Sequence, residues 1–208
     1  MTLSLSEKKL SYAAAPDFAI IEAVRRIQEL ESRLEKAEQQ VRLFQRVSRL
    51  MTRDMNLNDV LQEIVGLARD FLLCDSCLIY LMEGDELVLF ASDEPTQKEI
   101  GKVRLRLDEG LTGWVARERR LLAISREAYN DPRFKYFADL PQDTFEAFLS
   151  APIISQSKIV GVINVQHREA HAHSGDDIEM LSTLGEQIGC VLALSQRKRV
   201  ECLLEQLS

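Results

Sequence analysis

The feature that most constrains this chain is a heptad repeat near its N-terminus. Two interleaved series of residues recur every seven positions and occupy the a and d positions of five heptads. No Gly or Pro interrupts residues 17–55, which are rich in the helix formers Glu, Gln, Arg and Leu. The pattern predicts one helix of about 35 residues, roughly 50 Å long. The a series is Ile20, Ile27, Leu34, Val41 and Ser48, and the d series is Ala23, Leu30, Ala37, Phe44 and Met51.

The charges that flank these heptads favour a parallel homodimer. In a parallel pair, Arg26 at position g faces Glu31 at position e of the second copy, and Arg33 likewise faces Glu38. An antiparallel pair would bring like charges together. The alternative is an amphipathic helix packed on its own domain. Over short spans the heptad repeat of a coiled coil is similar to the period of an ordinary amphipathic helix. The predicted dimer interface comprises Ile20, Ile27, Leu30, Leu34, Val41 and Phe44.

Charge and hydropathy argue against two classes of partner. The chain has 208 residues, a formal net charge of −7 and a pI near 5.1. Nucleic-acid binding needs a basic face that releases counterions, so we expect no nucleic-acid partner. The longest apolar runs, 149–154 and 159–165, fall far short of the ~20 residues that span a bilayer, so we expect no membrane partner.

The N-terminal residues and the cysteines favour a cytoplasmic location. No continuous apolar stretch follows Lys8 and Lys9, as a signal peptide would require. Four cysteines without such a signal are typical of reduced thiols rather than of a disulfide framework. We therefore expect a cytoplasmic protein with one principal domain.

Beyond the heptads, short strands lie between two further helices. Residues 55–58 break the first helix, and Asn56 is suited to cap the second. The last helix begins at Ser174, whose hydroxyl can cap the amide near Asp177, and continues toward the C-terminus. This order predicts an α+β fold with an antiparallel sheet of about six strands and helices on one face. The expected strands are 77–81, 86–91, 103–107, 121–124, 147–154 and 159–167.

These features divide the chain into four parts. Residues 1–16 lack periodicity and are expected to form a flexible arm, and residues 17–55 form the coiled-coil dimerisation helix. Residues 56–196 form the globular domain, and residues 197–208 extend its last helix.

Residues 108–116, with the sequence DEGLTGWVA, resemble the Gly-rich strand-to-helix turn of GAF domains. The likeness continues in the family's order over most of residues 57–196. Residues 134–137 and 145–148 also resemble the N-terminal sensor domain of the nitrogen-branch phosphotransferase enzyme I. The resemblance implies a PAS-like sheet with terminal helices on one face and a ligand pocket on the other. The further matching segments are 130–134, 148–154, 159–163 and 174–181.

The implied pocket is closed by residues 125–146, an irregular segment that carries five aromatic side chains. Aromatic rings that tie down an irregular segment must be buried, and a pocket wall is one way to bury them. A self-filled pocket is the alternative, because aromatic side chains are more often core than site. Nothing in the sequence identifies the ligand or any cofactor. The residues expected to touch a ligand are Phe90, Phe134, Phe145 and Asn164 or Gln166.

Two clusters are candidates for metal or thiol chemistry. Cys74 and Cys77 have CxxC spacing, and His167, His171 and His173 have HxxxHxH spacing, which suits a metal but also exposed histidines. No cysteine lies between 78 and 189, where GAF domains that attach bilins or reduce methionine sulfoxide carry their thiols.

Cyclic-nucleotide-binding GAF domains carry an Asn-Lys, Phe and Asp-Glu signature near the last helix. Asn164 and Asp177 match it here, but Val165, His173 and Ile178 replace its other residues. That departure weakens a cyclic-nucleotide assignment.

The sequence contains no phosphate-binding loop, dinucleotide turn, nucleophile elbow or zinc-protease motif. We therefore predict a non-catalytic, dimeric sensor that binds a small molecule and signals to a downstream protein through its terminal helices. The alternatives are a dimerisation adaptor with a self-filled pocket and a thiol- or metal-dependent redox sensor.

Overall fold

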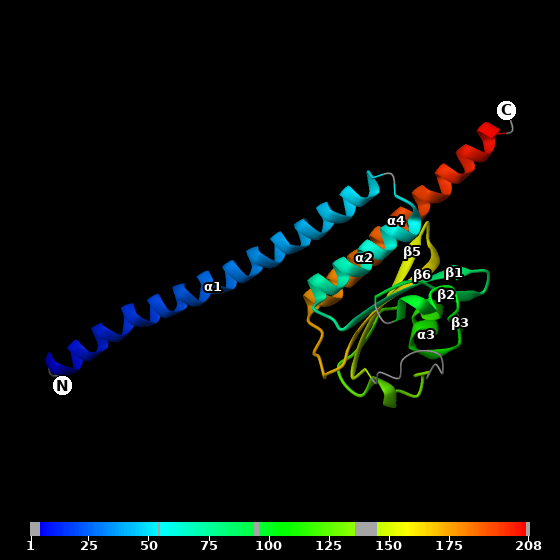
Figure 1. Ribbon diagram of the computed structural model, residues 1–208. Coiled ribbons are helices and arrows are strands. Elements are labelled where there is room, and N and C mark those ends of the chain that lie inside the picture. Colours follow the sequence, from blue (N-terminus) through cyan, green and yellow to red (C-terminus); the bar gives the residue numbers. More distant parts are fainter. Residues whose placement is uncertain (1–4, 54, 94–95, 136–144, 207–208) are drawn as a thin grey trace. The chain divides into compact units, whose positions relative to one another are not determined.

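The computed structural model describes residues 5–53, 55–93, 96–135 and 145–206. The chain forms two compact units, one up to Arg42 and one from Leu43 onward. Helix α1, Leu5–Met51, crosses the boundary between them (Figure 1). The helix begins twelve residues before position 17, where we expected it to begin, so most of the expected arm is helical. The Glu, Lys, Leu and Ala residues of that stretch are good helix formers.

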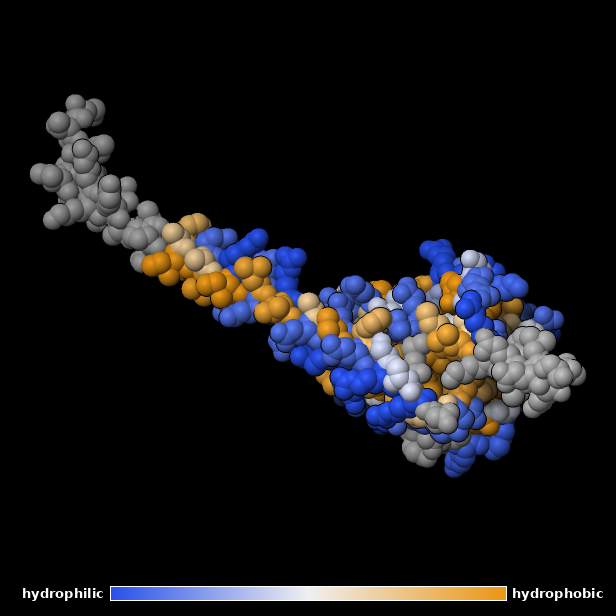
Figure 2. Space-filling view, turned by 90° about the horizontal axis from the view of Figure 1, so that it is seen from above, coloured by the Kyte–Doolittle hydropathy of each residue, from blue (hydrophilic) through white to orange (hydrophobic). Residues whose placement is uncertain are grey.

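The first unit is a helix with an uncovered apolar stripe. Its apolar side chains are roughly half to three-quarters exposed, from Val24 at 48% to Phe18 at 72%. Figure 2 shows this stripe as a band of hydrophobic residues along the helix. Exposed apolar stripes of this extent mark interaction surfaces.

The end of α1 belongs to the second unit and uses a different face. Leu43, Val47 and Leu50 are buried in the core of that unit. Their spacing of four and three residues places them on one side of the helix. The heptad positions Val41 and Phe44 remain 55% and 51% exposed. The helix therefore has two apolar faces near its end, whereas the heptad pattern predicted only one.

The predicted α+β architecture is confirmed in the second unit. Six antiparallel strands form one sheet in the order β3-β2-β1-β6-β5-β4. The elements are α2 (Leu57–Leu72), β1 (Ser76–Glu83), β2 (Glu86–Ser92), η1 (Thr96–Glu99), β3 (Arg104–Arg106), α3 (Gly110–Glu118), β4 (Leu122–Ile124), η2 (Ala128–Asn130), β5 (Ala147–Ser155), β6 (Lys158–His167) and α4 (Gly175–Gln206).

Both predicted helix caps are present. The Asn56 side chain accepts a hydrogen bond from the Asp59 amide at 2.9 Å and caps α2. At the start of α4, the Asp177 amide donates to Ser174 Oγ at 3.2 Å, and the Ser174 amide donates to Asp177 Oδ2 at 2.7 Å. This reciprocal pair satisfies donors that a helix start would otherwise leave unpaired.

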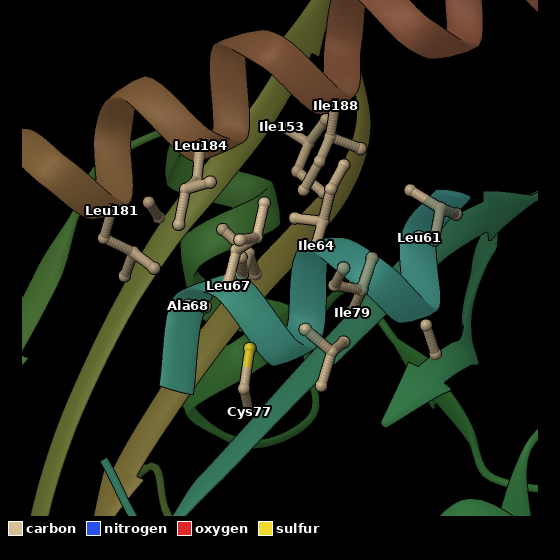
Figure 3. Close-up of a cluster of buried hydrophobic side chains, with 14 of the residues drawn as sticks. Leu61, Ile64, Leu67, Ala68, Cys77, Ile79, Ile153, Leu181, Leu184 and Ile188 are labelled. Carbon is tan, nitrogen blue, oxygen red and sulfur yellow. The ribbon is translucent and has the colours of Figure 1, made fainter. Parts of the chain in front are cut away.

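Helices α2 and α4 cover one face of the sheet, and α3 lies against the other (Figure 1). Figure 3 shows side chains of α2 and α4 meeting those of β1 and β5 in the larger core. Helix α4 lies so close to β5 that a Cβ at Gly189 would come 2.3 Å from the Ile154 carbonyl oxygen. Among the described helices, none is both long and apolar enough to cross a bilayer.

Candidate functional site

The α3 face of the sheet is built around the predicted Gly-rich turn. Gly110 has a φ of +68°, a conformation that favours glycine, and it opens α3. A Cβ at Gly113 would lie 2.5 Å from the Arg106 carbonyl oxygen, so only glycine lets α3 lie this close to the chain after β3. The two glycines therefore set the position of α3.

A buried polar bridge fixes α3 to the sheet. Asn164 on β6 accepts a hydrogen bond from Ser150 Oγ at 2.6 Å and donates one to Thr112 Oγ1 at 2.8 Å. All three side chains are buried. Asn164 or Gln166 was expected to touch a ligand, and in the structure the Asn164 amide connects β5, β6 and α3.

Residues 127–130 are held to the sheet through Glu146. The Glu146 carboxylate accepts hydrogen bonds from the Glu127 amide at 2.9 Å and from the Tyr129 hydroxyl at 3.0 Å. Its backbone amide donates to the His167 carbonyl at 2.9 Å. This role of Glu146 was not predicted, because a lone carboxylate in an irregular segment gives no local signal.

Residues 131–135 lie over the start of α3. The Arg133 guanidinium is 4.6 Å from the centre of the Trp114 ring, in a cation–π contact. It also forms a two-pronged pair with Asp131, at 2.8 and 2.7 Å, which lowers the pKa of that carboxyl. Lys135 Nζ lies 3.0 Å from Glu109 Oε2. Charge pairs and one aromatic ring therefore hold this segment on the α3 face.

Phe134 and Gln166, two of the predicted ligand contacts, lie on the α3 side of the sheet. Phe134 packs on a cluster of Leu111, Ala128 and Phe148. Gln166 is two residues from Asn164 on β6 and so shares its face, and it is half-buried. Phe145 is also half-buried. Residues 136–144 of the predicted closing segment lie outside the described residues.

Phe90 lies apart from this group. It packs on the core under α2 and α4, whereas its neighbour Leu89 belongs to the α3-side core. Successive residues of a strand point to opposite faces, so Phe90 cannot share the face of Leu89. The register of β2 against β1 also shifts between Ile79 and Tyr80, opposite Phe90. Strand alternation alone did not show whether Phe90 faces α3 or faces α2 and α4.

A concavity lies on the exposed side of α2. It has a volume of about 450 Å³ and is lined by the end of α1 and the exposed side of α2. Its lining includes three acidic residues and one basic residue, namely Asp59, Glu63, Asp70 and Arg46. It was not anticipated from the sequence, because its residues look like ordinary solvated helix positions.

The CxxC cysteines are buried thiols. Cys77 is the second residue of β1 and points into the core beneath α2 (Figure 3). Burial, together with the negative charge of Asp93, raises the pKa of Cys74 to about 12. Burial likewise raises the pKa of Cys77 well above its usual value. Because the thiolate is the reactive form, these cysteines are poorly suited to thiol exchange.

The three histidines meet where β6 ends and α4 begins. One nitrogen from each of His167, His171 and His173 lies within 4.8 Å of the others. The rings of His167 and His171 are stacked, with centroids 4.0 Å apart. Burial and the neighbouring rings lower the pKa of His167 to about 4 and also lower that of His173. The three imidazole side chains therefore form one cluster.

Comparison with known proteins matches the family model of the GAF domain to residues 56–192. The phosphoenolpyruvate-dependent phosphotransferase system proteins of Escherichia coli K12 and Salmonella typhimurium LT2 are each 32% identical to this chain over 122 residues. The match covers 58% of this chain and 16% of each relative, so the chain spans only a small part of these proteins.

Solved structures show the same fold. The GAF domain of a phosphoenolpyruvate-protein phosphotransferase from Coxiella burnetii has a TM-score of 0.72 at 24% identity, covering 79% of this chain and 98% of that one. The corresponding Acinetobacter domain has a TM-score of 0.68 at 24% identity, covering 76% and 95%. A free methionine-R-sulfoxide reductase from Neisseria meningitidis has a TM-score of 0.65 at 16% identity, covering 79% and 93%.

Proposed function

Because this chain belongs to the GAF domain family, we propose that it is a non-catalytic sensory domain that binds a small molecule on the α3 face of its sheet. The observation that carries the proposal is the way residues 127–135 are held over that face. Charge pairs, the Trp114 ring and the Glu146 carboxylate fix this segment, while Gln166 and Phe134 stay half-buried beside it. Small-molecule sites combine such apolar walls with a few fixed polar groups.

The ligand contacts in this proposal are Phe134, Phe145 and Gln166. Phe90 is left out because it packs in the opposite core, and Asn164 braces the wall rather than facing a ligand. Arg133 and Lys135 place two cations at the same face. The anionic group of a ligand would replace the carboxylate that now pairs with Arg133 or with Lys135.

Several GAF domains of this fold are enzymes, and the thiol inventory argues against that role here. Free methionine-R-sulfoxide reductases are among the structural neighbours. The family resemblance implies that GAF domains with this activity carry their thiols within the stretch that corresponds to residues 78–189. In this chain Cys74 and Cys77 lie in the core on the helix side, and Cys190 lies on the exposed side of α4. No cysteine occurs between Leu78 and Gly189, so the α3 face has no nucleophilic sulfur to contribute.

A self-filled pocket is the competing function, and one observation favours it. The Arg133–Trp114 stack and the Phe134 cluster already use the aromatic rings that a ligand would contact. In that case the domain would serve only to hold a dimer together.

Native mass spectrometry of freshly purified protein separates these functions. A retained small molecule supports the sensor, and a bare dimer supports the adaptor. Trp114, the one tryptophan of the chain, lies on the α3 face and gives a second readout. Its emission should change when a ligand binds there. A ligand that binds without changing it would place the site elsewhere, for example in the concavity on α2.

We also propose that the chain acts as a parallel homodimer through α1. The uncovered stripe includes Ile20, Ile27 and Leu34, each more than half exposed. Arg26 and Glu38, expected to pair between chains, make exposed pairs with Glu29 and Arg42 of their own helix at 3.5 and 3.2 Å. Exposed pairs of this kind contribute only about 0.3–0.5 kcal/mol, so exchanging them for pairs between chains costs little.

We propose that the effect of ligand binding is transmitted through the terminal helices. The end of α1, α2 and α4 share the core on the face opposite α3. A ligand that shifts the sheet would alter how these helices pack. The effect cannot exceed the ligand's differential affinity for the two helix arrangements, typically about 1–3 kcal/mol. By analogy with the relatives, a downstream phosphotransferase-type signalling protein is the proposed recipient.

A further inference from the structure

We propose that His167, His171 and His173 form a binding site for a late first-row divalent cation of the zinc type. The site lies between the end of β6 and the start of α4, and it is distinct from the ligand site proposed on the α3 face. Its function would be to tie the sheet to α4 in a metal-dependent way.

The donor set fits such a cation. Three imidazole nitrogens, one from each residue, lie within 4.8 Å of one another. A zinc ion at its usual distance of about 2.0–2.1 Å from each nitrogen requires separations of roughly 3.3 Å. A turn of one ring would close the difference. Imidazole is a preferred ligand for zinc, copper and nickel, whereas magnesium and calcium prefer oxygen.

One of the donors is unsatisfied without a partner. His173 Nε2 is buried and has no hydrogen-bond partner. A buried ring nitrogen without a partner costs free energy, and a metal ion bound there would offset that cost. The unpartnered Nε2 therefore marks His173 as a ligand position.

An acidic group stands beside the histidines. Asp177 Oδ2 is 3.8 Å from His171 Nε2. Its position is fixed because the same oxygen accepts the capping hydrogen bond from the Ser174 amide. A carboxylate here can complete a tetrahedral site, either directly or by orienting a bound water.

One ring must turn for the site to close. His167 and His171 are stacked at an interplanar angle of 10°, so their in-plane lone pairs run side by side rather than toward one point. The His171 side chain is 38% exposed, and its backbone is anchored by a 2.9 Å hydrogen bond to the Ser125 carbonyl. His171 is therefore the ring free to rotate. Metal binding should break the stack.

The site would connect three parts of the domain. His167 is the last residue of β6, His171 and His173 lie on the connection, and Asp177 is in the first turn of α4. The metal would then hold the start of α4, the helix through which we propose the domain signals.

The test uses the full chain, without an affinity tag and stripped of metal, titrated with zinc chloride. The chain contains three histidines, so imidazole ¹H–¹⁵N spectra report this cluster alone. All three imidazoles should shift together and saturate at one equivalent of zinc. Competition with a chromophoric chelator should show binding weakened more than about 10-fold in His171→Gln, and by about 10–100-fold in Asp177→Asn.

Cys190→Ser and Glu179→Gln are the matched controls, because both remove an exposed potential ligand outside the cluster. They should bind zinc as the parent does. Circular dichroism of each variant checks that it is folded. Imidazole signals that do not move at stoichiometric zinc would overturn the proposal. So would equal zinc affinity in His171→Gln and the parent, or loss of binding in Cys190→Ser.

Discussion

Replacing Asn164 with alanine removes both hydrogen bonds that brace α3 against the sheet. Each buried hydroxyl left without a partner costs about 1–3 kcal/mol. The Ser150 and Thr112 hydroxyls are both buried, although they can rotate to find partial compensation. We therefore expect the free energy of unfolding to fall by about 3 kcal/mol.

Urea denaturation followed by circular dichroism measures this loss, at one fixed protein concentration because the chain is expected to dimerise. A slope of about 2 kcal/mol per molar translates the loss into a fall of about 1–2 M in the midpoint. The combined variant Asn164→Leu, Ser150→Ala and Thr112→Val removes every polar partner. It should recover most of the loss, because replacing a whole hydrogen-bonded set by apolar groups is nearly neutral.

The result that would refute this reasoning is an Asn164→Ala variant with an unchanged midpoint and a lost response to ligand. Asn164 would then contact the ligand, as the sequence pattern first indicated, and would not brace α3.

Three further outcomes are expected. Replacing Ile27 and Leu34 with glutamate should give a monomer in light scattering, whereas Ser32→Glu with Gln39→Glu, on the opposite side of the heptads, should leave the mass unchanged. Gly189→Ala should lower the free energy of unfolding by about 1–3 kcal/mol in urea denaturation, because its Cβ would meet a carbonyl oxygen at 2.3 Å; an unchanged midpoint would mean that α4 lies farther from β5. Since its guanidinium partner lowers the pKa of Asp131 in the folded state, the pair stabilises the domain above about pH 4, and this contribution is lost as the pH falls further. The stability difference between the parent and Asp131→Asn should therefore shrink in acid, and a constant difference would contradict it.

Local signals in the sequence predicted most of the fold. Asn56 and Ser174 cap their helices because a short polar side chain reaches the backbone amides three residues on. The strands were recognised from alternation and turn residues, and the Gly-rich turn from the two glycines that the close approach of α3 requires. Each of these signals lies within a few residues of its consequence.

Features that depend on distant partners were not predictable in the same way. Leu43, Val47 and Leu50 form a second apolar face on α1, but the heptad pattern hides it because those positions fall outside the seam. Phe90 was predicted on the wrong face of the sheet, because the face that it occupies depends on how β2 pairs with its neighbours.

The candidate site was predictable in part. Phe134 and Gln166 lie on the expected face, yet the bridge from Asn164 to Thr112 spans 52 residues of sequence and left no local trace. The spacing of the histidines was visible, but their convergence required the turn between β6 and α4.

Hydrogen exchange with and without the small molecule recovered from the purified protein tests the central claim most directly. If the domain senses a ligand on the α3 face and signals through its helices, protection should change in residues 108–135 and also in residues 20–55 and 190–208. A change confined to residues 90–167 would contradict transmission to the helices, and a change confined to the concavity on α2 would contradict the proposed ligand site.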